Sequence, residues 1–410
     1  MMALPKVLLL TGSPPGDNGV GQIIVKEICR NYPQDRVVCF ATLSRHEQWE
    51  KPAEFKDLAV RIGVKRYEHR IQPMPGPVGA TVAMAAYWGM FRRHCRHLTC
   101  DAVEFGREHQ CEILFSILES ATNIQITDAV ARGIGIPKRV LVWDAPDYIA
   151  THLGQMPLNV SAISSAFQKA VKNADALAVV SEPMARLYRQ QFGLESVILR
   201  HAAPPAEPSF ESQSDDSTCE RDPIVIAFAG SVSARPQLDV LQRALDLMHW
   251  KIGGREVRLD LYGMRFVLES RGPRNVRYCG YRSVAETVEA LCKTADVLFM
   301  PQPFESELAS FTELSFPTKL STYFAAGHPI LLLSPPVSSL GEFFQECPFG
   351  VWCQEMEPSK VAEAIEKIVT DKQVRATALQ NIRQQLEGAF SQNFFREQLH
   401  RFLAPANTVA

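Results

Sequence analysis

The chain has 410 residues, of which 46% are hydrophobic and 21% are charged. A length of this order predicts two domains, and the ordinary composition excludes a disordered or fibrous protein. The 43 Lys and Arg residues are balanced by 45 Asp and Glu residues, a net charge of -2. This balance argues against a globally basic nucleic-acid-binding protein, so an anionic ligand would have to be bound by a local group of cations.

The ten cysteines contain no CxxC pair, and several lie inside apolar runs. This pattern predicts reduced, buried thiols in a cytoplasmic protein rather than a disulfide framework. The short apolar run near the N-terminus ends in Gly and Pro, so we interpret it as a first strand and not as a signal segment. The chain has no run of 18 apolar residues, and we expect no membrane span.

The first half of the chain alternates short apolar runs, rich in Val, Ile and Leu, with longer amphipathic stretches. Apolar strands separated by helices are typical of parallel βαβ units whose sheet is covered on both faces. The apolar runs predict strands at residues 7–10, 36–40, 112–117, 139–143 and 176–180. The amphipathic stretches predict helices near residues 21–30, 80–97, 123–132, 161–172 and 183–191.

Residues 205–223 interrupt this alternation with an acidic stretch rich in Pro and Ser, which we interpret as an exposed linker. The alternation then restarts. It predicts strands at residues 224–229, 257–262, 276–279, 297–300 and 330–333. It predicts helices at residues 238–248, 284–293, 319–326 and 361–369, and the aromatic-rich stretch 390–402 predicts a last helix.

This repetition predicts an α/β protein of two Rossmann-like domains with parallel sheets that face each other across a cleft. We expect an N-terminal domain over residues 1–204 and a C-terminal domain over 224–389, joined by the linker 205–223. A C-terminal helix within 390–410 is expected to pack back on the N-terminal domain. In such folds, ligands bind beyond the C-terminal ends of the strands.

A glycine-rich turn follows the first predicted strand and opens the first helix. Gly19, Val20 and Gly21 would let a ligand approach the amides at the helix N-terminus, so they are candidates for an acceptor or phosphate loop. The turn is not a P-loop, because no Gly-Lys-Ser/Thr follows, and it does not read GxGxxG. The alternative is an ordinary tight turn between a strand and a helix.

The second half begins in the same way. Gly230 and Ser231 end its first strand, and Arg235 follows before a helix near Pro236. Gly230 permits a close approach, Ser231 offers a hydroxyl, and Arg235 can contact phosphate oxygens bidentately. The alternative for Arg235 is a solvated loop residue.

The most specific pattern starts at Pro317 and reads Pro-x-Lys-Leu-x-x-Tyr-x-Ala-Ala-Gly-x-Pro-Ile up to Ile330. This string resembles the donor-binding signature of glycosyltransferases with the GT-B fold, especially the large family 4. Other hallmarks of these enzymes stand in the expected order over nearly the whole chain. They are the N-terminal glycine-rich loop and residues 179–182, 228–231, 261–263, 276–280 and 295–301.

The resemblance implies that a nucleotide-activated sugar binds to the C-terminal half and a hydroxyl-bearing acceptor to the N-terminal half. It also implies retention of the anomeric configuration and no bound metal. Arg235 and Lys319 are then the cations that meet the charge growing on the diphosphate, with the amides of the Gly230 loop assisting. The further donor-binding positions implied are Pro317, Leu320, Thr322, Tyr323 and Glu313.

The chain departs from the family pattern at Thr322, where relatives usually carry a Glu that holds the ribose hydroxyls. A threonine can bond one hydroxyl but cannot accept bidentately. Glu313 and Glu307 lie nine and fifteen residues upstream of Thr322. These spacings differ from that of the paired glutamates in the family.

Asp144 and Asp147 follow the predicted strand 139–143. Either carboxylate could orient an acceptor hydroxyl or stabilise an oxocarbenium-like transition state. The alternative is a helix N-cap before a Tyr-containing turn. Glu119 and His152 are secondary candidates for the same role.

Residues 85–98 predict an amphipathic helix with a Trp/Met/Phe face and a basic edge. Such a helix can lie on an anionic lipid surface, and the alternative is a core-packed helix with a basic outer face. Nearby histidines and cysteines raise a zinc hypothesis, although their spacing matches no standard closed site. They are His94, Cys95, His97 and Cys100.

We therefore expect a glycosyltransferase that moves a sugar from a nucleoside diphosphate sugar to a hydroxyl acceptor. We expect it in the cytoplasm, with peripheral contact at the inner membrane surface through residues 85–98 as a further possibility, and with no nucleic-acid partner. The alternatives are a sugar-nucleotide epimerase or hydrolase on the same scaffold, and a non-catalytic subunit that binds a nucleotide sugar. The base, the sugar and the acceptor leave no signature in the sequence.

Overall fold

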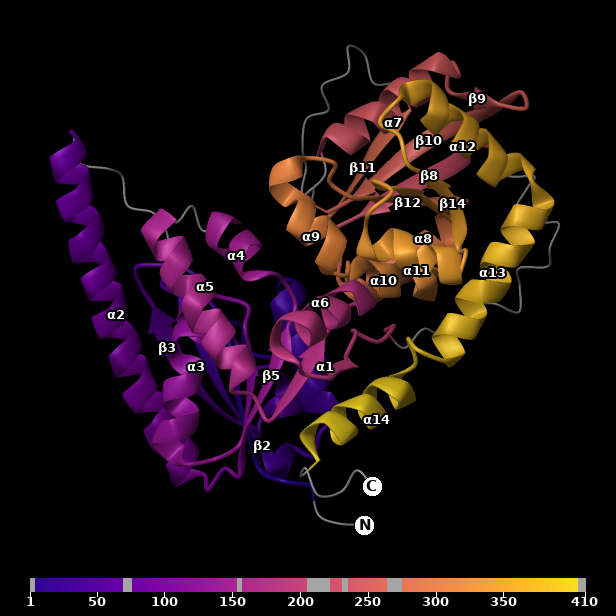
Figure 1. Ribbon diagram of the computed structural model, residues 1–410. Coiled ribbons are helices and arrows are strands. Elements are labelled where there is room, and N and C mark those ends of the chain that lie inside the picture. The colour runs from indigo at the N-terminus through magenta and orange to yellow at the C-terminus, as the bar shows by residue number, and fades with distance from the viewer. Residues whose placement is uncertain are drawn as a thin grey trace. The chain divides into compact units, whose positions relative to one another are not determined.

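The structure is a computed structural model that describes residues 4–68, 76–152, 157–204, 222–230, 235–263 and 275–404. The chain forms two compact units (Figure 1). The first comprises Met1–Arg200 and Phe395–Ala410, and the second comprises His201–Phe394. Most of the expected linker, residues 205–221, lies outside the described residues.

The described part of the first unit contains one sheet in the order β3-β2-β1-β4-β5-β6-β7, and all its neighbouring strands are parallel. The strands are β1 (Val7–Thr11), β2 (Val37–Ser44), β3 (Ala59–Lys65), β4 (Ile113–Ile117), β5 (Lys138–Val142), β6 (Ala176–Val179) and β7 (Ser196–Ile198). The helices are α1 (Val20–Arg30), α2 (Pro77–Glu108), α3 (Ala121–Ile134), α4 (Pro146–His152), α5 (Pro157–Lys172), α6 (Glu182–Phe192) and, from Phe395 onwards, α14 (Gln392–Leu403).

The second unit repeats this plan, with parallel strands in the order β11-β10-β8-β12-β13-β14 and β9 antiparallel to β10. The strands are β8 (Ile224–Ala229), β9 (Lys251–Ile252), β10 (Arg255–Tyr262), β11 (Val276–Gly280), β12 (Val297–Pro301), β13 (Ile330–Leu333) and β14 (Gly350–Cys353). The helices are α7 (Arg235–Leu247), α8 (Val284–Thr294), α9 (Ala309–Leu314), α10 (Lys319–Ala326), α11 (Ser339–Glu346), α12 (Pro358–Thr370) and α13 (Lys372–Glu387).

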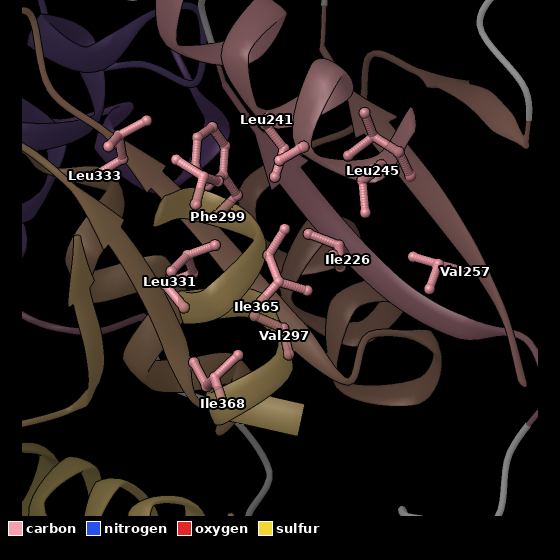
Figure 2. Close-up of a cluster of buried hydrophobic side chains, with 14 of the residues drawn as sticks. Ile226, Leu241, Leu245, Val257, Val297, Phe299, Leu331, Leu333, Ile365 and Ile368 are labelled. Carbon is pink, nitrogen blue, oxygen red and sulfur yellow. The ribbon is translucent and has the colours of Figure 1, made fainter. Parts of the chain in front are cut away.

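The core of the second unit shows why its strands are apolar at every position. Figure 2 shows Ile226 and Phe299, from β8 and β12, packed among Leu241 of α7 and Ile365 of α12. The residues next to them in the strands point to the opposite face, where they pack with α8 and α10. Helices cover both faces, so the prediction of parallel α/β domains is confirmed.

The sequence did not predict β3, β7, β9 and β14, or helices α4, α9, α11 and α13. The strands β3, β7 and β14 lie at sheet edges, where each pairs with one neighbour only. An edge strand is partly solvated and mixes polar with apolar residues, as in β3, where Ile62 and Val64 are 36% and 39% exposed. The strand β3 therefore lacks the continuous apolar run that identifies a central strand.

The C-terminal helix α14 is fastened to the first unit by aromatic and polar contacts. The Phe402 ring meets the Phe115 ring edge-on, with centroids 5.4 Å apart. His400 Nε2 lies 2.9 Å from the Asn31 carbonyl oxygen, and its ring stands edge-on to Tyr32. Phe395 and Phe402 thus belong to the packing face of the helix, whereas Phe394 is 38% exposed.

Candidate functional site

The two sheets share one topology, and it places a switch point in each. The strand order reverses between β1 and β4 in the first unit, and between β8 and β12 in the second. In open parallel sheets, ligands bind beyond the carboxyl ends of the strands at this place. The loops that follow these four strands are therefore the candidate sites of the two units.

Lys319 is the central charged group at the switch point of the second unit. It opens α10, and its Nζ lies 4.5 Å from the centroid of the Phe228 ring at the end of β8. The same Nζ lies 3.6 Å from the position that a Cβ on Gly230 would occupy. The Lys319 ammonium thus lies beside Phe228 and Gly230, at the carboxyl end of β8.

The charge of Lys319 has no counter-ion among the described residues: its ammonium forms neither an ion pair nor a hydrogen bond there. Burial lowers the pKa of Lys319 from 10.5 to about 8, because desolvation disfavours the charged form. The ring face of Phe228 offers only partial compensation through a cation–π contact. A desolvated cation without a carboxylate is typical of a site that receives an anion.

Tyr323 holds α10 against the sheet. Its hydroxyl accepts a hydrogen bond from the Ala229 amide at 2.9 Å and donates one to the Phe299 carbonyl at 3.1 Å. Tyr323 and Leu320 have no exposed surface. These two signature residues therefore anchor the helix that carries Lys319, and their side chains are not accessible to a ligand.

The turn at Gly230 is shaped by the neighbouring strand β10. Gly230 has a φ of +115°, and its amide donates to the Tyr262 carbonyl at 3.0 Å. That amide was expected to assist at a diphosphate, and in the structure it is already engaged. A Cβ on Gly263 would lie 2.6 Å from the Gly230 carbonyl oxygen, so this close approach needs glycine at 263, while the positive φ favours glycine at 230.

The remaining predicted donor residues lie around the start of α10 and α7. Pro317 and Thr322 are partly buried, and Glu313 on α9 is exposed. Arg235 is exposed and is the first residue of α7, the helix that follows β8. Ser231 lies outside the described residues.

Two buried polar residues near strand ends were not singled out from the sequence. Gln302 follows β12 at the switch point and is 3% exposed, and its side-chain oxygen accepts no hydrogen bond from the described residues. Glu68 follows β3 and accepts a hydrogen bond from the Thr122 amide at 2.6 Å. A polar residue directly after an apolar run was a usable signal for Gln302, whereas Glu68 lies in a polar stretch and had none.

At the switch point of the first unit, a carboxylate of the chain itself lies inside the loop that follows β1. Oε1 of Glu119 accepts hydrogen bonds from Thr11 Oγ1 and from the Gly12 amide, both at 2.6 Å. The Ser13 hydroxyl donates to Oε2 at 3.4 Å. Burial raises the pKa of Glu119, while these hydrogen bonds and the charge of Lys65 act in the opposite direction.

The glycines of this loop make room for that carboxylate. A Cβ on Gly12 would lie 3.0 Å from Cδ of Glu119. A Cβ on Gly21 would lie 2.5 Å from Ser13 Oγ and 3.1 Å from Glu119 Oε2. Gly21, predicted to let a ligand approach, is thus crowded by the chain's own side chains.

The other two residues of the predicted loop lie at the start of α1. Gly19 is the N-cap, with a φ of +88° and no side-chain cap, and Val20 is 52% exposed. The first turn of α1 is therefore the part of this loop that remains open to solvent.

Asp144 and Asp147 lie at the carboxyl end of β5. Asp144 is partly buried, and Asp147 is exposed in the first turn of α4. Burial raises the pKa of the Tyr188 hydroxyl, and the negative charges of Asp147 and Asp144 raise it further. Both carboxylates therefore lie near the end of the sheet where an acceptor would bind.

The structure tests the zinc hypothesis for α2 by the directions of its four residues. Cys95 is buried and Cys100 is exposed, while Nε2 of His94 lies 2.6 Å from the Val64 carbonyl oxygen. Within the described ranges, no group of three or more His, Cys, Asp or Glu side chains could hold a metal ion. Cys95 and Cys100 therefore lie on different faces of the helix.

The apolar residues of segment 85–98 differ in their burial. Phe91 and Leu98 are 1% and 2% exposed, whereas Met90 is 43% exposed. The core-packed alternative therefore describes Phe91 and Leu98, and the arginines of the segment remain on the outside. Among the helices that the structure describes, we find none with the length and apolarity needed to cross a bilayer.

We expect Tyr323→Phe to lower the free energy of unfolding by about 1–3 kcal/mol, because it leaves the Ala229 amide and the Phe299 carbonyl buried without partners. Urea unfolding measures this change. The matched control is Tyr281→Phe, which removes a hydroxyl from a side chain that is 68% exposed and should change stability by less than about 0.5 kcal/mol. Equal stabilities of the two variants would contradict the anchoring role of Tyr323.

Gly21→Ala should destabilise the first unit by about 1–3 kcal/mol, because the added methyl group overlaps Ser13 Oγ. Gly89→Ala is the control, since nothing lies within 4 Å of a Cβ at this exposed helical position. This substitution should raise the free energy of unfolding by up to about 1 kcal/mol. The double variant Ser13→Gly/Gly21→Ala should recover part of the loss. A Gly21→Ala protein as stable as the parent would show that the loop is not crowded.

Solved structures with the same architecture cover almost the whole chain. The Anabaena protein HepE, in complex with UDP and glucose, matches with a TM-score of 0.60 and 14% identity over 97% of this chain and 99% of its own. Sucrose-phosphate synthase from Thermosynechococcus elongatus matches with a TM-score of 0.65 and 12% identity, covering 97% of this chain and 98% of its own. WaaG, a glycosyltransferase involved in lipopolysaccharide biosynthesis, matches with a TM-score of 0.57 and 14% identity, covering 98% of this chain and 100% of its own.

No family model matches the sequence, and no curated protein matches it at a significant level. The identities to the solved structures are low, so these likenesses show the fold. Each match covers 97% or 98% of this chain and at least 98% of the other chain. The chain therefore has the GT-B fold of nucleotide-sugar glycosyltransferases.

Proposed function

We propose that the chain is a glycosyltransferase that moves a sugar from a nucleoside diphosphate sugar to a hydroxyl-bearing acceptor. The observation that carries this proposal is Lys319, a desolvated cation without a counter-ion in the described part of the chain, at the switch point of the second unit. A diphosphate placed there would supply the missing negative charge.

The chemistry of the step explains why this position matters. When the bond between sugar and diphosphate breaks, negative charge grows on the diphosphate oxygens. An ammonium held beside these oxygens stabilises the transition state more than the ground state, and it acts strongly where water is excluded. We assign this role to Lys319 and, at the start of α7, to Arg235. The residues described contain no clustered carboxylates for a metal that would do the same.

The other assignments follow the two units. Thr322 on α10 can bond one ribose hydroxyl of the nucleotide, while Pro317 and Glu313 lie nearby in the chain. UDP-sugars are the first donors to test, since HepE has been crystallised with UDP-glucose. In the first unit, we assign Asp144 or Asp147 to the acceptor hydroxyl, with Gly19 and Val20 bordering the same end of the sheet.

We also propose a cytoplasmic location. Six of the nine described cysteines are buried, and burial raises the pKa of thiols such as Cys29 and Cys95 to about 12. Such thiols are protonated, packed core groups, as expected in a reducing compartment. Contact with an anionic membrane surface through the outer arginines of segment 85–98 stays a prediction.

The direct test combines ligand binding with turnover. Nucleoside diphosphates and UDP-sugars should raise Tm by mass action, and the parent protein should transfer sugar only when a hydroxyl acceptor is present. A changed or hydrolysed sugar without an acceptor would favour an epimerase or hydrolase. Nucleotide binding without turnover would favour a non-catalytic subunit, for which the threonine at position 322 is the supporting feature.

Lys319→Met should weaken nucleoside diphosphate binding roughly tenfold to hundredfold, because one charge-assisted contact is worth about 1.5–3 kcal/mol. It should abolish transfer while leaving Tm equal or higher, since a desolvated charge is replaced by an apolar chain. The control is Lys251→Met, at an exposed lysine of the same unit. Parent-like affinity of Lys319→Met would refute the assignment.

The pKa of Lys319 predicts a pH dependence. Only the ammonium attracts a diphosphate, so affinity should be constant below pH 8 and fall roughly tenfold per pH unit above it, a trend absent in Lys319→Met. The stability of the unliganded protein should change with pH in the opposite direction. Because the folded-state pKa lies below the unfolded value of 10.5, stability should rise as the pH increases from about 8 towards 10.5.

A further inference from the structure

A second concave site lies in the first unit, on the helical layer. Helices α2, α3 and α5 lie side by side (Figure 1), and a groove with a volume of about 590 Å³ runs between them. A cavity of roughly 300–1,000 Å³ is the size that binds small molecules. Its lining residues come from the middle turns of the three helices and not from the loops after the strands, so it is separate from the strand-end site.

Four cations line this groove. Arg92 and Arg96 come from α2, Arg132 from α3 and Lys169 from α5. All four side chains are exposed, and none of them forms an ion pair or a hydrogen bond with a residue that the structure describes. Like charges held together repel one another, and an anion bound among them would relieve this repulsion.

The acidic residue in the lining does not cancel this charge. Asp128 is bound to the buried Lys138 ammonium, and the Asn173 amide donates to its second oxygen at 3.4 Å. The pair of Asp128 with Lys138 is neutral, so the four exposed cations leave the groove strongly positive. The chain as a whole has a net charge of -2, and the positive field is therefore local to this groove.

Besides the charged residues, the lining combines apolar side chains with three polar ones, Thr99, Gln125 and Ser165. Trp88, Ile124 and Ala162 contribute apolar surface between the cations. Gln125 also lines the groove, and its side-chain oxygen is buried and accepts no hydrogen bond in the described part of the chain. A ligand for this groove thus combines negative charge with an apolar part.

From these observations we propose that the groove between α2, α3 and α5 binds a phosphorylated ligand. Arginine is the residue best suited to phosphate oxygens, and three of the four cations are arginines. The phosphate can belong to a soluble molecule or to the headgroup of an anionic lipid at a membrane surface. The proposal does not depend on transferase activity.

The test uses the full chain with the groove variant Arg96→Gln/Arg132→Gln. Its control is Arg401→Gln/Arg243→Gln, which removes the same charge from exposed residues that do not line the groove and lie outside segment 85–98. One probe is inorganic pyrophosphate in calorimetry, measured also with Lys319→Met so that the strand-end site does not contribute. The other is flotation with phosphatidylcholine vesicles, with and without phosphatidylglycerol.

We expect the groove variant to bind its probe roughly tenfold weaker for each cation removed, with an unchanged Tm, while the control binds like the parent. If the Lys319→Met protein still binds pyrophosphate, the ligand of the groove is a soluble molecule. Binding only to vesicles with phosphatidylglycerol assigns a lipid headgroup. The proposal is overturned if neither probe binds, if only an acidic peptide such as polyglutamate binds, or if groove and control variants bind alike.

Discussion

One desolvated ammonium group organises the second unit. The charge of Lys319 lies on the ring of Phe228 with no carboxylate nearby among the described residues. The surrounding residues keep it there: Tyr323 pins its helix to two strands, and glycine at 230 leaves the space open. A desolvated cation lowers the stability of the fold that holds it. An anion bound beside the cation would raise the stability again. This is the physical basis of the proposed donor site.

The first unit has the same strand order and the opposite electrostatics. At its switch point, the inside of the loop is occupied by the chain's own carboxylate, Glu119, which engages the Gly12 amide and the Thr11 hydroxyl. The loop is therefore already ordered without a ligand phosphate. Two copies of one architecture thus differ in the charge they can accept, which fits a division into a unit for an anionic donor and a unit for a neutral acceptor.

Local charge also decides what the helical layer can do. A net charge of -2 excludes a globally basic surface, yet four cations gather in the groove between α2, α3 and α5. The amphipathic helix α2 has two roles: buried apolar residues of the helix pack in the core of the unit, and two of its arginines line the groove. The composition of a chain cannot reveal such a cluster, because the cations come from three helices far apart in sequence.

The sequence by itself determined the α/β class, the central strands and the helix that carries Lys319, because buried parallel strands need continuous apolar runs and the 317–330 string is distinctive. Edge strands such as β3 were missed, since a half-solvated strand has no such run. Only the tertiary structure decided what individual site residues do. Leu320 and Tyr323 proved to be buried anchors, and Gly21 proved to make room for Ser13 and Glu119. The contacts of Tyr323 with Ala229 and of Gly21 with Glu119 join residues more than 90 positions apart, and no local pattern encodes them.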